Sequence, residues 1–282
     1  MSSNVHTLRV KDQVLDLSER PVMGILNVTP DSFFDGGKYQ RVAAAVHQCG
    51  LMLSEGASII DIGANSSRPG SEPVSAEREL ELLTPIVKAI REKYADAVLS
   101  IDTFRHQVAD EMLNEGAHII NDISAGDDDP EMLSVIAQHK ATYIAMHKRG
   151  STRDMQRSPE YDDVLRDVHA YFGKKADQFT KLGITEYVID PGFGFGKTVE
   201  HNYQLLKHLQ SFSDVFQRPV LAGVSRKSMI NRVLGVKPSD ALNGTTVLNT
   251  IALINGAHIL RVHDVKEAVE AVRLISALKG VA

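Results

Sequence analysis

The sequence is poor in cysteine and has no tryptophan: Cys49 is the one cysteine among 282 residues. A single cysteine cannot form an intrachain disulfide, so we expect a reducing cytoplasm, with Cys49 as a packed thiol on a helix. No apolar run reaches the roughly 18 residues that span a membrane. The first residues, MSSNVHTLRVKDQ, have no apolar core of a secretory signal peptide. The sequence therefore predicts a cytoplasmic protein without a membrane partner.

An excess of basic residues is also missing. The chain has 31 lysines and arginines against 36 aspartates and glutamates, for a formal net charge of −5. Domains that bind nucleic acid are usually basic, so the composition argues against a nucleic-acid partner. Hydrophobic residues make up 43% of the chain, which is enough for a large core. The length is ordinary for a single α/β barrel, which needs about 250 residues.

Short apolar runs alternate with helical patterns along the chain. The runs predicted as strands are Val22–Val28, Ala57–Ile62, Val98–Ile101, His118–Ile120, Thr142–Ala145, Tyr187–Ile189, Pro219–Val224 and His258–Val262. The stretches with helical spacing are Arg41–Glu55, Glu77–Lys93, His106–Asn114, Pro130–His139, Tyr161–Lys181, Asn202–Phe212, Ser239–Ile254 and Val265–Leu278. Several helices are followed by glycine, the usual C-cap, as in EGASII, EGAHII, LGITEYVI and NGAHIL.

This alternation predicts a parallel sheet with helices outside, and eight units favour a closed (β/α)8 TIM barrel. The alternative is an open doubly wound sheet, which would usually carry a glycine-rich turn after its first strand. The long segment NVTPDSFFDGGKY stands there instead. We therefore predict a single α/β barrel over residues 21–282. Residues 1–20 are predicted as a short N-terminal β-hairpin that turns near Lys11 and Asp12.

Polar residues follow all eight predicted strands, whereas the other strand ends carry mostly glycine, alanine or proline. Barrel enzymes work at the C-terminal ends of their strands, so this one-sided pattern predicts an enzyme with a polar pocket. The polar residues at these ends are Asn27, the ANSSRPGS segment, Asp102, Asn121 with Asp122, His147, Asp190, Ser225 to Lys227, Arg261 and His263.

The carboxylates among these residues indicate a nitrogen-rich ligand. Asp102 and Asp190 each close an apolar strand, and a carboxylate matches an amidine-like N–C–N edge with two hydrogen bonds. Asn121 donates and accepts, which suits a heteroaromatic ring. Asp122 is explained equally well as a helix cap, and His147 as a structural hydrogen-bonding group.

Basic residues near the last strands indicate an anion site. Arg261 and His263 are two residues apart, so they share one side of an extended strand. Together with Asn27 on the neighbouring first strand, they could hold a phosphate group, as is common near the last strands of this fold. Lys227 follows the seventh strand, and Arg226 beside it has the weaker functional case. No zinc spacing is present, but Mg²⁺ accompanying a phosphate is compatible with these residues.

The stretch DPGFGFGKT resembles a nucleotide-binding P-loop only at its end. That loop requires G-x-x-x-x-G-K-[ST], and the first glycine would fall at Pro191. Proline has no N–H to offer a phosphate. Asp190 is therefore the informative residue of the stretch, and Lys197 is predicted to be a loop charge.

Seven motifs together resemble those of dihydropteroate synthase, in the same order. They are MGILNVTPDSFFDGGKY, SSRPGS, SIDTF, NDIS, DPGFGFGKT, GVSRKS and ILRVHDV, which extend from Met23 to Val265. The resemblance implies a (β/α)8 barrel, usually a homodimer, that serves folate biosynthesis and is the target of sulfonamides. The implied reaction joins 6-hydroxymethyl-7,8-dihydropterin diphosphate to p-aminobenzoate and releases diphosphate.

The resemblance also implies the roles of the site residues. The pterin pocket would be lined by Asp102, Asn121, Asp190 and Lys227. The diphosphate would be held by Asn27, Arg261 and His263, with Mg²⁺ on Asn27. The p-aminobenzoate site would contain Ser67, Arg68, Pro69, Phe195 and Ser228, with a mobile first loop at residues 31–37. The catalytic residues would be Asp102, Asp190, Lys227 and Arg261.

Some residues depart from the common family pattern. Many members carry GGESTRPG in the second loop, where this chain has GANSSRPG, so Ala64, Asn65 and Ser67 differ. Lys148 stands where an apolar residue is common. Two alternatives share part of the pattern: a pterin-binding methyltransferase, which does not need the RVH and SRKS segments, and a non-catalytic pterin-binding paralogue. The paralogue should lose Asn27, Arg261 or Lys227, and all three are present.

Overall fold

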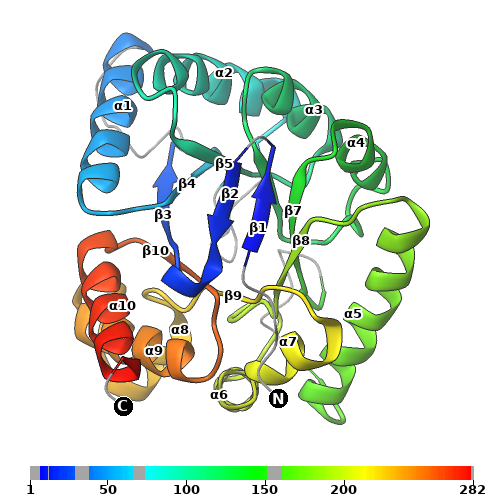
Figure 1. Ribbon diagram of the computed structural model, residues 1–282, viewed down its shortest axis with the longest axis vertical. Helices are drawn as coiled ribbons and strands as arrows, with labels where there is room; N and C mark the ends of the chain where they lie inside the picture. The colour runs from blue at the N-terminus through cyan, green and yellow to red at the C-terminus, as the bar shows by residue number, and fades with distance from the viewer. Residues whose placement is uncertain (1–6, 12, 29–37, 66–73, 151–159, 281–282) are drawn as a thin grey trace.

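The computed structural model describes residues 7–11, 13–28, 38–65, 74–150 and 160–280, which form a closed parallel barrel inside a ring of helices (Figure 1). The barrel strands are β3 (Val22–Asn27), β4 (Ile59–Gly63), β5 (Val98–Asp102), β6 (Ile119–Asp122), β7 (Thr142–Met146), β8 (Tyr187–Asp190), β9 (Leu221–Ala222) and β10 (Ile259–Val262). Their order is β8-β7-β6-β5-β4-β3-β10-β9. A parallel bridge between Ile189 and Val220 joins β8 to the segment before β9 and closes the ring. The predicted (β/α)8 barrel is therefore confirmed.

The helices surround the barrel in chain order. They are α1 (Lys38–Ser54), α2 (Ala76–Lys93), α3 (His106–Asn114), α4 (Met132–His139), α5 (Val164–Lys181), α6 (Val199–Lys207), α7 (Gln210–Phe216), α8 (Ser228–Leu234), α9 (Leu242–Ile254) and α10 (Val265–Lys279), with a 3₁₀ turn η2 (Pro238–Asp240) before α9. Within the described residues, none of these helices has the length and apolarity needed to cross a membrane.

Local sequence signals explain where many helices begin and end. The side chains of Ser75, Asp163 and Thr198 accept hydrogen bonds from backbone N–H groups in the first turns of α2, α5 and α6. The glycines predicted as C-caps have positive φ angles, 101° at Gly56 and 98° at Gly116, for example. Such angles suit glycine, which has no Cβ.

One helix prediction was wrong, and one helix was missed. The stretch predicted as one helix over Asn202–Phe212 forms two, α6 and α7, with a break at His208 and Leu209. The short helix α8 was not predicted at all, since its seven residues are too few for a periodic pattern to stand out. This helix matters because Lys227 is its N-cap residue.

An antiparallel hairpin closes the amino end of the barrel. It consists of β1 (Thr7–Val10) and β2 (Gln13–Asp16), followed by the 3₁₀ turn η1 (Leu17–Glu19), and lies across the centre of the barrel in Figure 1. Leu8, Val10 and Leu17 pack on one layer of strand residues, which comprises Met23, Ile59, Val98, Ile119, Ile144, Val188, Leu221 and Ile259. This hydrophobic plug leaves the carboxyl end of the barrel for polar chemistry.

Candidate active site

The inward-facing residues become polar towards the carboxyl ends of the strands. Asp102 is the last residue of β5, Asp190 is the last of β8, and Asn121 is the third residue of β6. Asn121 and Asp190 are each 4% exposed. The parallel register puts Asp102 beside Asn121 and Asp190 beside Met146. Three of the predicted pocket residues therefore lie at one end of the barrel, as expected of a barrel enzyme.

Arg261 joins two carboxylates inside this end of the barrel. Its Nε donates to Asp61 Oδ2 at 2.6 Å, and its Nη2 donates to Asp102 Oδ2 at 2.6 Å. Asn121 Nδ2 also donates to Asp61 Oδ2, at 3.0 Å. An arginine in this position neutralises two acids and fixes the orientation of both.

Asp61 is a site residue that the sequence analysis missed. It lies in the middle of β4, which reads IIDIG, and it is fully buried. The prediction considered only residues at the ends of strands, and Asp61 lies inside one. The available signal was the carboxylate inside an otherwise apolar buried strand, because a buried charge requires a partner.

Burial shifts the pKa values of the charged groups at this end. It raises the pKa of Asp102 to about 7, while Arg261 opposes the shift. It also raises the pKa of Asp190, which Lys227 opposes. Burial lowers the pKa of Lys227 to about 8, and Asp190 counteracts this. Asp61 and Asp102 raise the pKa of Arg261, so its guanidinium remains charged. For each of these carboxylates and for Lys227, an oppositely charged neighbour thus favours the charged form that burial disfavours.

The glycine-rich turn after β8 is attached to Lys227. Gly192 N–H donates to Asp190 Oδ1 at 2.7 Å, and Lys227 Nζ donates to Phe193 O at 2.6 Å. The ring of Phe195 lies 4.8 Å from Lys227 Nζ, in a cation–π contact. Lys227 therefore lies near both Phe195 and Asp190, although it comes from a different segment of the chain.

His263 follows β10 and is held by a serine. Ser225 Oγ accepts a hydrogen bond from His263 N–H at 3.2 Å and lies 3.0 Å from His263 Nδ1. A hydroxyl oxygen in this position can donate its own proton to Nδ1. The imidazole proton would then be on Nε2, available to an anion.

The remaining predicted residues differ in how far the structure describes them. Asn27 ends β3 with an exposed side chain, and β3 is paired with β10, which carries Arg261. Ser228 is the first residue of α8, directly after Lys227. Ser67, Arg68, Pro69 and residues 31–37 lie outside the described residues.

The structure resolves two of the uncertain assignments, those of Arg226 and Asp122. Arg226 is structural, because it pairs with both carboxylate oxygens of Asp264 at 2.8 and 2.9 Å. Asp122 is not a helix cap; it accepts from Ser124 N, Gly126 N and the Tyr143 hydroxyl, and so fixes the turn after β6. His147 is buried, with its ring edge-on to Tyr171 at 4.8 Å, but its Nδ1 has no hydrogen-bond partner among the described residues, so its two alternative roles both stand.

The predictions for Lys197 and Cys49 had different outcomes. The prediction that Lys197 is a loop charge was wrong, because its side chain is only 3% exposed. Cys49 is a buried free thiol, as predicted.

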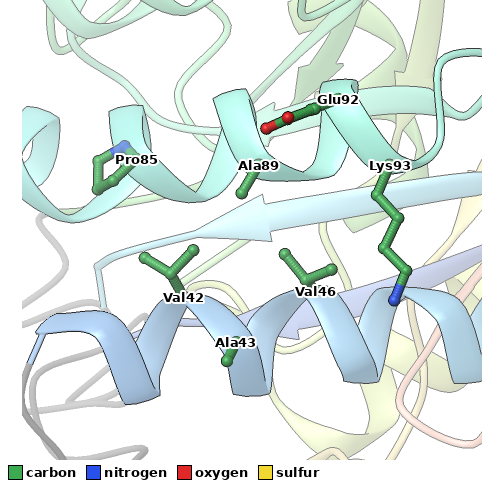
Figure 2. A pocket seen from close by; sticks show the side chains of 7 residues that line it. All are labelled: Val42, Ala43, Val46, Pro85, Ala89, Glu92 and Lys93. Atoms are coloured by element: carbon green, nitrogen blue, oxygen red, sulfur yellow. The ribbon is translucent and has the colours of Figure 1, made fainter.

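A groove on the outside of the barrel is separate from this site. The groove lies between α1 and α2 (Figure 2). Its volume is about 750 Å³. Its lining consists of Val42, Ala43, Val46, Pro85, Ala89, Glu92 and Lys93. It belongs to the helical layer, so it does not contribute to the chemistry at the strand ends.

Comparisons with known proteins agree with this geometry. The family model of pterin binding enzymes matches residues 23–263. A dihydropteroate synthase of Escherichia coli strain K12 is 46% identical over 265 residues, which cover 93% of each chain. The Yersinia pestis dihydropteroate synthase, solved with a sulfonamide drug, superposes with a TM-score of 0.91 at 42% identity, covering 98% of this chain and 100% of that one. The Xanthomonas albilineans enzyme, solved with 7,8-dihydropteroate, gives 0.88 at 36% identity, with coverage of 98% and 100%. The chain belongs to the dihydropteroate synthase family of pterin-binding enzymes.

Proposed function

We propose that this transferase joins 6-hydroxymethyl-7,8-dihydropterin diphosphate to p-aminobenzoate at the carboxyl end of its barrel. The products are 7,8-dihydropteroate and diphosphate. The observation that carries the proposal is the partly buried charge array in which Arg261 pairs with Asp61 and Asp102, while Lys227 interacts electrostatically with Asp190. Such an array supplies both signs of charge at one end of the barrel.

The pterin ring is assigned to Asp102, Asn121, Asp190 and Lys227. A pterin has an amidine-like edge with several N–H donors and a carbonyl on the adjacent side. Asp190 would accept from the donor edge, and Lys227 would donate to the carbonyl. Asp61 joins this group as a positioning residue, because it orients both Arg261 and Asn121.

The chemistry follows from the distribution of charge. Cleavage of the carbon–oxygen bond leaves positive charge on the electron-rich pterin, and the buried carboxylates stabilise that charge. Arg261 and His263 would stabilise the departing diphosphate. The arylamine is already a nucleophile, so no strong base is required. We propose a dissociative mechanism, in which the bond to diphosphate breaks before the bond to nitrogen forms.

Magnesium is assigned to Asn27. No group of three histidine, cysteine or carboxylate residues within the described ranges could hold a metal by itself. The exposed amide oxygen of Asn27 still fits the ion, because Mg²⁺ is commonly bound by one or two protein groups together with substrate phosphates. Bound there, the ion would neutralise charge on the leaving diphosphate.

The p-aminobenzoate site is assigned to Phe195 and Ser228, together with Ser67, Arg68 and Pro69 from the second loop. The Xanthomonas albilineans relative was solved with 4-aminobenzoic acid, and the Yersinia pestis relative with a sulfonamide. Phe195 offers an aromatic face close to Lys227, which supports this assignment.

Product formation is the direct test of the function. With both substrates and Mg²⁺, we expect the protein to form 7,8-dihydropteroate and one diphosphate for each product molecule. Absence of product with intact, folded protein would contradict the proposal. Isotope scrambling in the diphosphate, measured without p-aminobenzoate, tests the mechanism: scrambling supports early bond cleavage, and its absence supports concerted displacement.

We also propose a homodimer formed through the face made by α8, α9 and α10. Among the described residues, eleven large apolar side chains are exposed, and seven of them lie on these three helices: Val233, Leu234, Val247, Ile251, Ile254, Leu274 and Leu278. The three helices are neighbours at the lower left of Figure 1. Exposed apolar surface concentrated in one region is typical of an interface, and a second copy would bury it symmetrically.

A single charge on this face tests the dimer. We expect the unmodified protein to sediment as a dimer and Ile254→Asp to sediment as a monomer, because a buried carboxylate without a partner opposes association. Val14→Asp is the matched control, since Val14 is a similarly exposed apolar residue on the hairpin. A monomeric unmodified protein at micromolar concentration would contradict the proposal.

The cellular location and the domain division are further assignments. The single cysteine, buried and free, fits a reducing cytoplasm. Residues 1–20 are assigned as an extension of the barrel at 21–282, because the hairpin packs its apolar face on the barrel interior.

A further inference from the structure

Lys197 is a buried lysine to which neither the family resemblance nor the proposed mechanism gives a role. It lies at the end of the glycine-rich turn between β8 and α6. Its Nζ donates to three backbone carbonyls: Gly192 O at 2.8 Å, Phe195 O at 3.0 Å and His147 O at 3.2 Å. An ammonium group has three donors. All three are engaged, so Lys197 has no donor left for a substrate.

These carbonyls come from two segments in close backbone contact, the turn after β8 and the segment after β7. The turn contains Gly192 and Gly196, both with positive φ angles, 72° and 63°. A Cβ at Gly192 would overlap His147 O, and a Cβ at Gly196 would overlap Arg149 O. The turn therefore packs backbone against backbone on the segment after β7. Converging carbonyl oxygens repel each other, and a central cation compensates that repulsion.

The same turn carries two groups assigned to substrates. Gly192 donates its N–H to Asp190 Oδ1, while its carbonyl accepts from Lys197. The carbonyl of Phe195 also accepts from Lys197, and the ring of Phe195 contacts Lys227. Burial lowers the pKa of Lys197 to about 7, whereas the nearby carboxylate of Asp190 favours the ammonium form. One ammonium group is thus linked to the residue assigned to the pterin and to the wall assigned to p-aminobenzoate.

We propose that Lys197 is a positioning residue of the synthase, whose ammonium group holds the Asp190–Phe195 turn against the end of β7. The proposal rests on the function assigned above. Without this cation the turn would lift from His147, and Phe195 would move away from Lys227. Phe195 is bound to Lys197 directly, whereas Asp190 keeps its separate bond to Gly192 N–H. Loss of the Lys197 ammonium group is therefore expected to weaken p-aminobenzoate binding more than pterin binding.

Lys197→Met removes the three donors and keeps the length of the side chain. We expect the KM for p-aminobenzoate to rise by about tenfold or more, since small displacements of positioning groups cost rates of this order. The affinity for the pterin substrate, measured without p-aminobenzoate, should change less than threefold. Lys207→Met is the matched control, because Lys207 is an exposed lysine on the following helix α6. A folded Lys197→Met protein with unchanged KM would overturn the proposal. A role in stability alone would lower the unfolding temperature without this change in KM.

A second variant tests the same contact without removing the charge. Gly196→Ala places a Cβ against Arg149 O and should raise the KM for p-aminobenzoate in the same direction. If Lys197→Met does not fold, Gly196→Ala becomes the deciding variant. An unchanged KM for p-aminobenzoate in Gly196→Ala would then overturn the proposal. The proposed function is judged on the unmodified protein. If that protein forms no dihydropteroate, the function itself fails, whereas an active unmodified protein with unaffected variants refutes only the role of Lys197.

Discussion

Replacing Arg261 by methionine should abolish product formation and lower the free energy of unfolding by about 3–5 kcal/mol, the usual cost of breaking a buried ion pair. The variant leaves Asp61 and Asp102 side by side without their cation. Asp61 is fully buried, so water cannot replace the lost guanidinium. Urea unfolding followed by circular dichroism measures the loss of stability, and dihydropteroate formation measures the loss of activity.

Two further variants test whether the lost stability comes from the unpaired buried charges. Arg273→Met on the exposed side of α10 should change stability by less than about 0.5 kcal/mol, as is usual for surface positions. Combining Asp61→Asn with Arg261→Met should recover part of the stability without recovering activity, because it removes one uncompensated charge. An Arg261→Met protein as stable as the unmodified one would contradict the role of this ion pair.

Replacing Asp190 by asparagine should weaken pterin binding by about 100-fold, or roughly 2.7 kcal/mol. The carboxylate can accept two hydrogen bonds from the donor edge of the ring, whereas an amide offers a donor to another donor. Hydrogen bonds to charged groups contribute about 1.5–3 kcal/mol each, which sets the size of the effect. Titration with the pterin substrate in the absence of p-aminobenzoate measures it directly.

The Asp190→Asn variant should remain folded, because the amide oxygen can still accept from Gly192 N–H. Asp177→Asn, at an exposed position of α5, is the control and should bind pterin normally. Unchanged pterin affinity in Asp190→Asn would refute the role assigned to this carboxylate, even if the protein were still a synthase.

Much of this molecule follows from local sequence patterns. The alternation of apolar runs with helical spacing predicted the barrel, and the glycines after helices predicted the C-caps at Gly56 and Gly116. The position of Asp102 and Asp190 after apolar runs predicted the end of the barrel that carries the site. These features depend on neighbours a few residues apart, so a single sequence contains the necessary information.

The charge partners inside the barrel were decided by tertiary structure alone. Arg261 is separated by 200 residues from Asp61 and by 159 from Asp102, and the three meet only because β10 closes against β3 beside β4 and β5. Lys197 was predicted to be a loop charge, because it lies at the end of a glycine-rich turn. Its burial depends on how that turn packs on His147, fifty residues earlier. Sequence periodicity determines which elements form. Which ionic groups meet, and which become buried, depends on how those elements close into a barrel, because charge pairing requires contact in space rather than proximity along the chain.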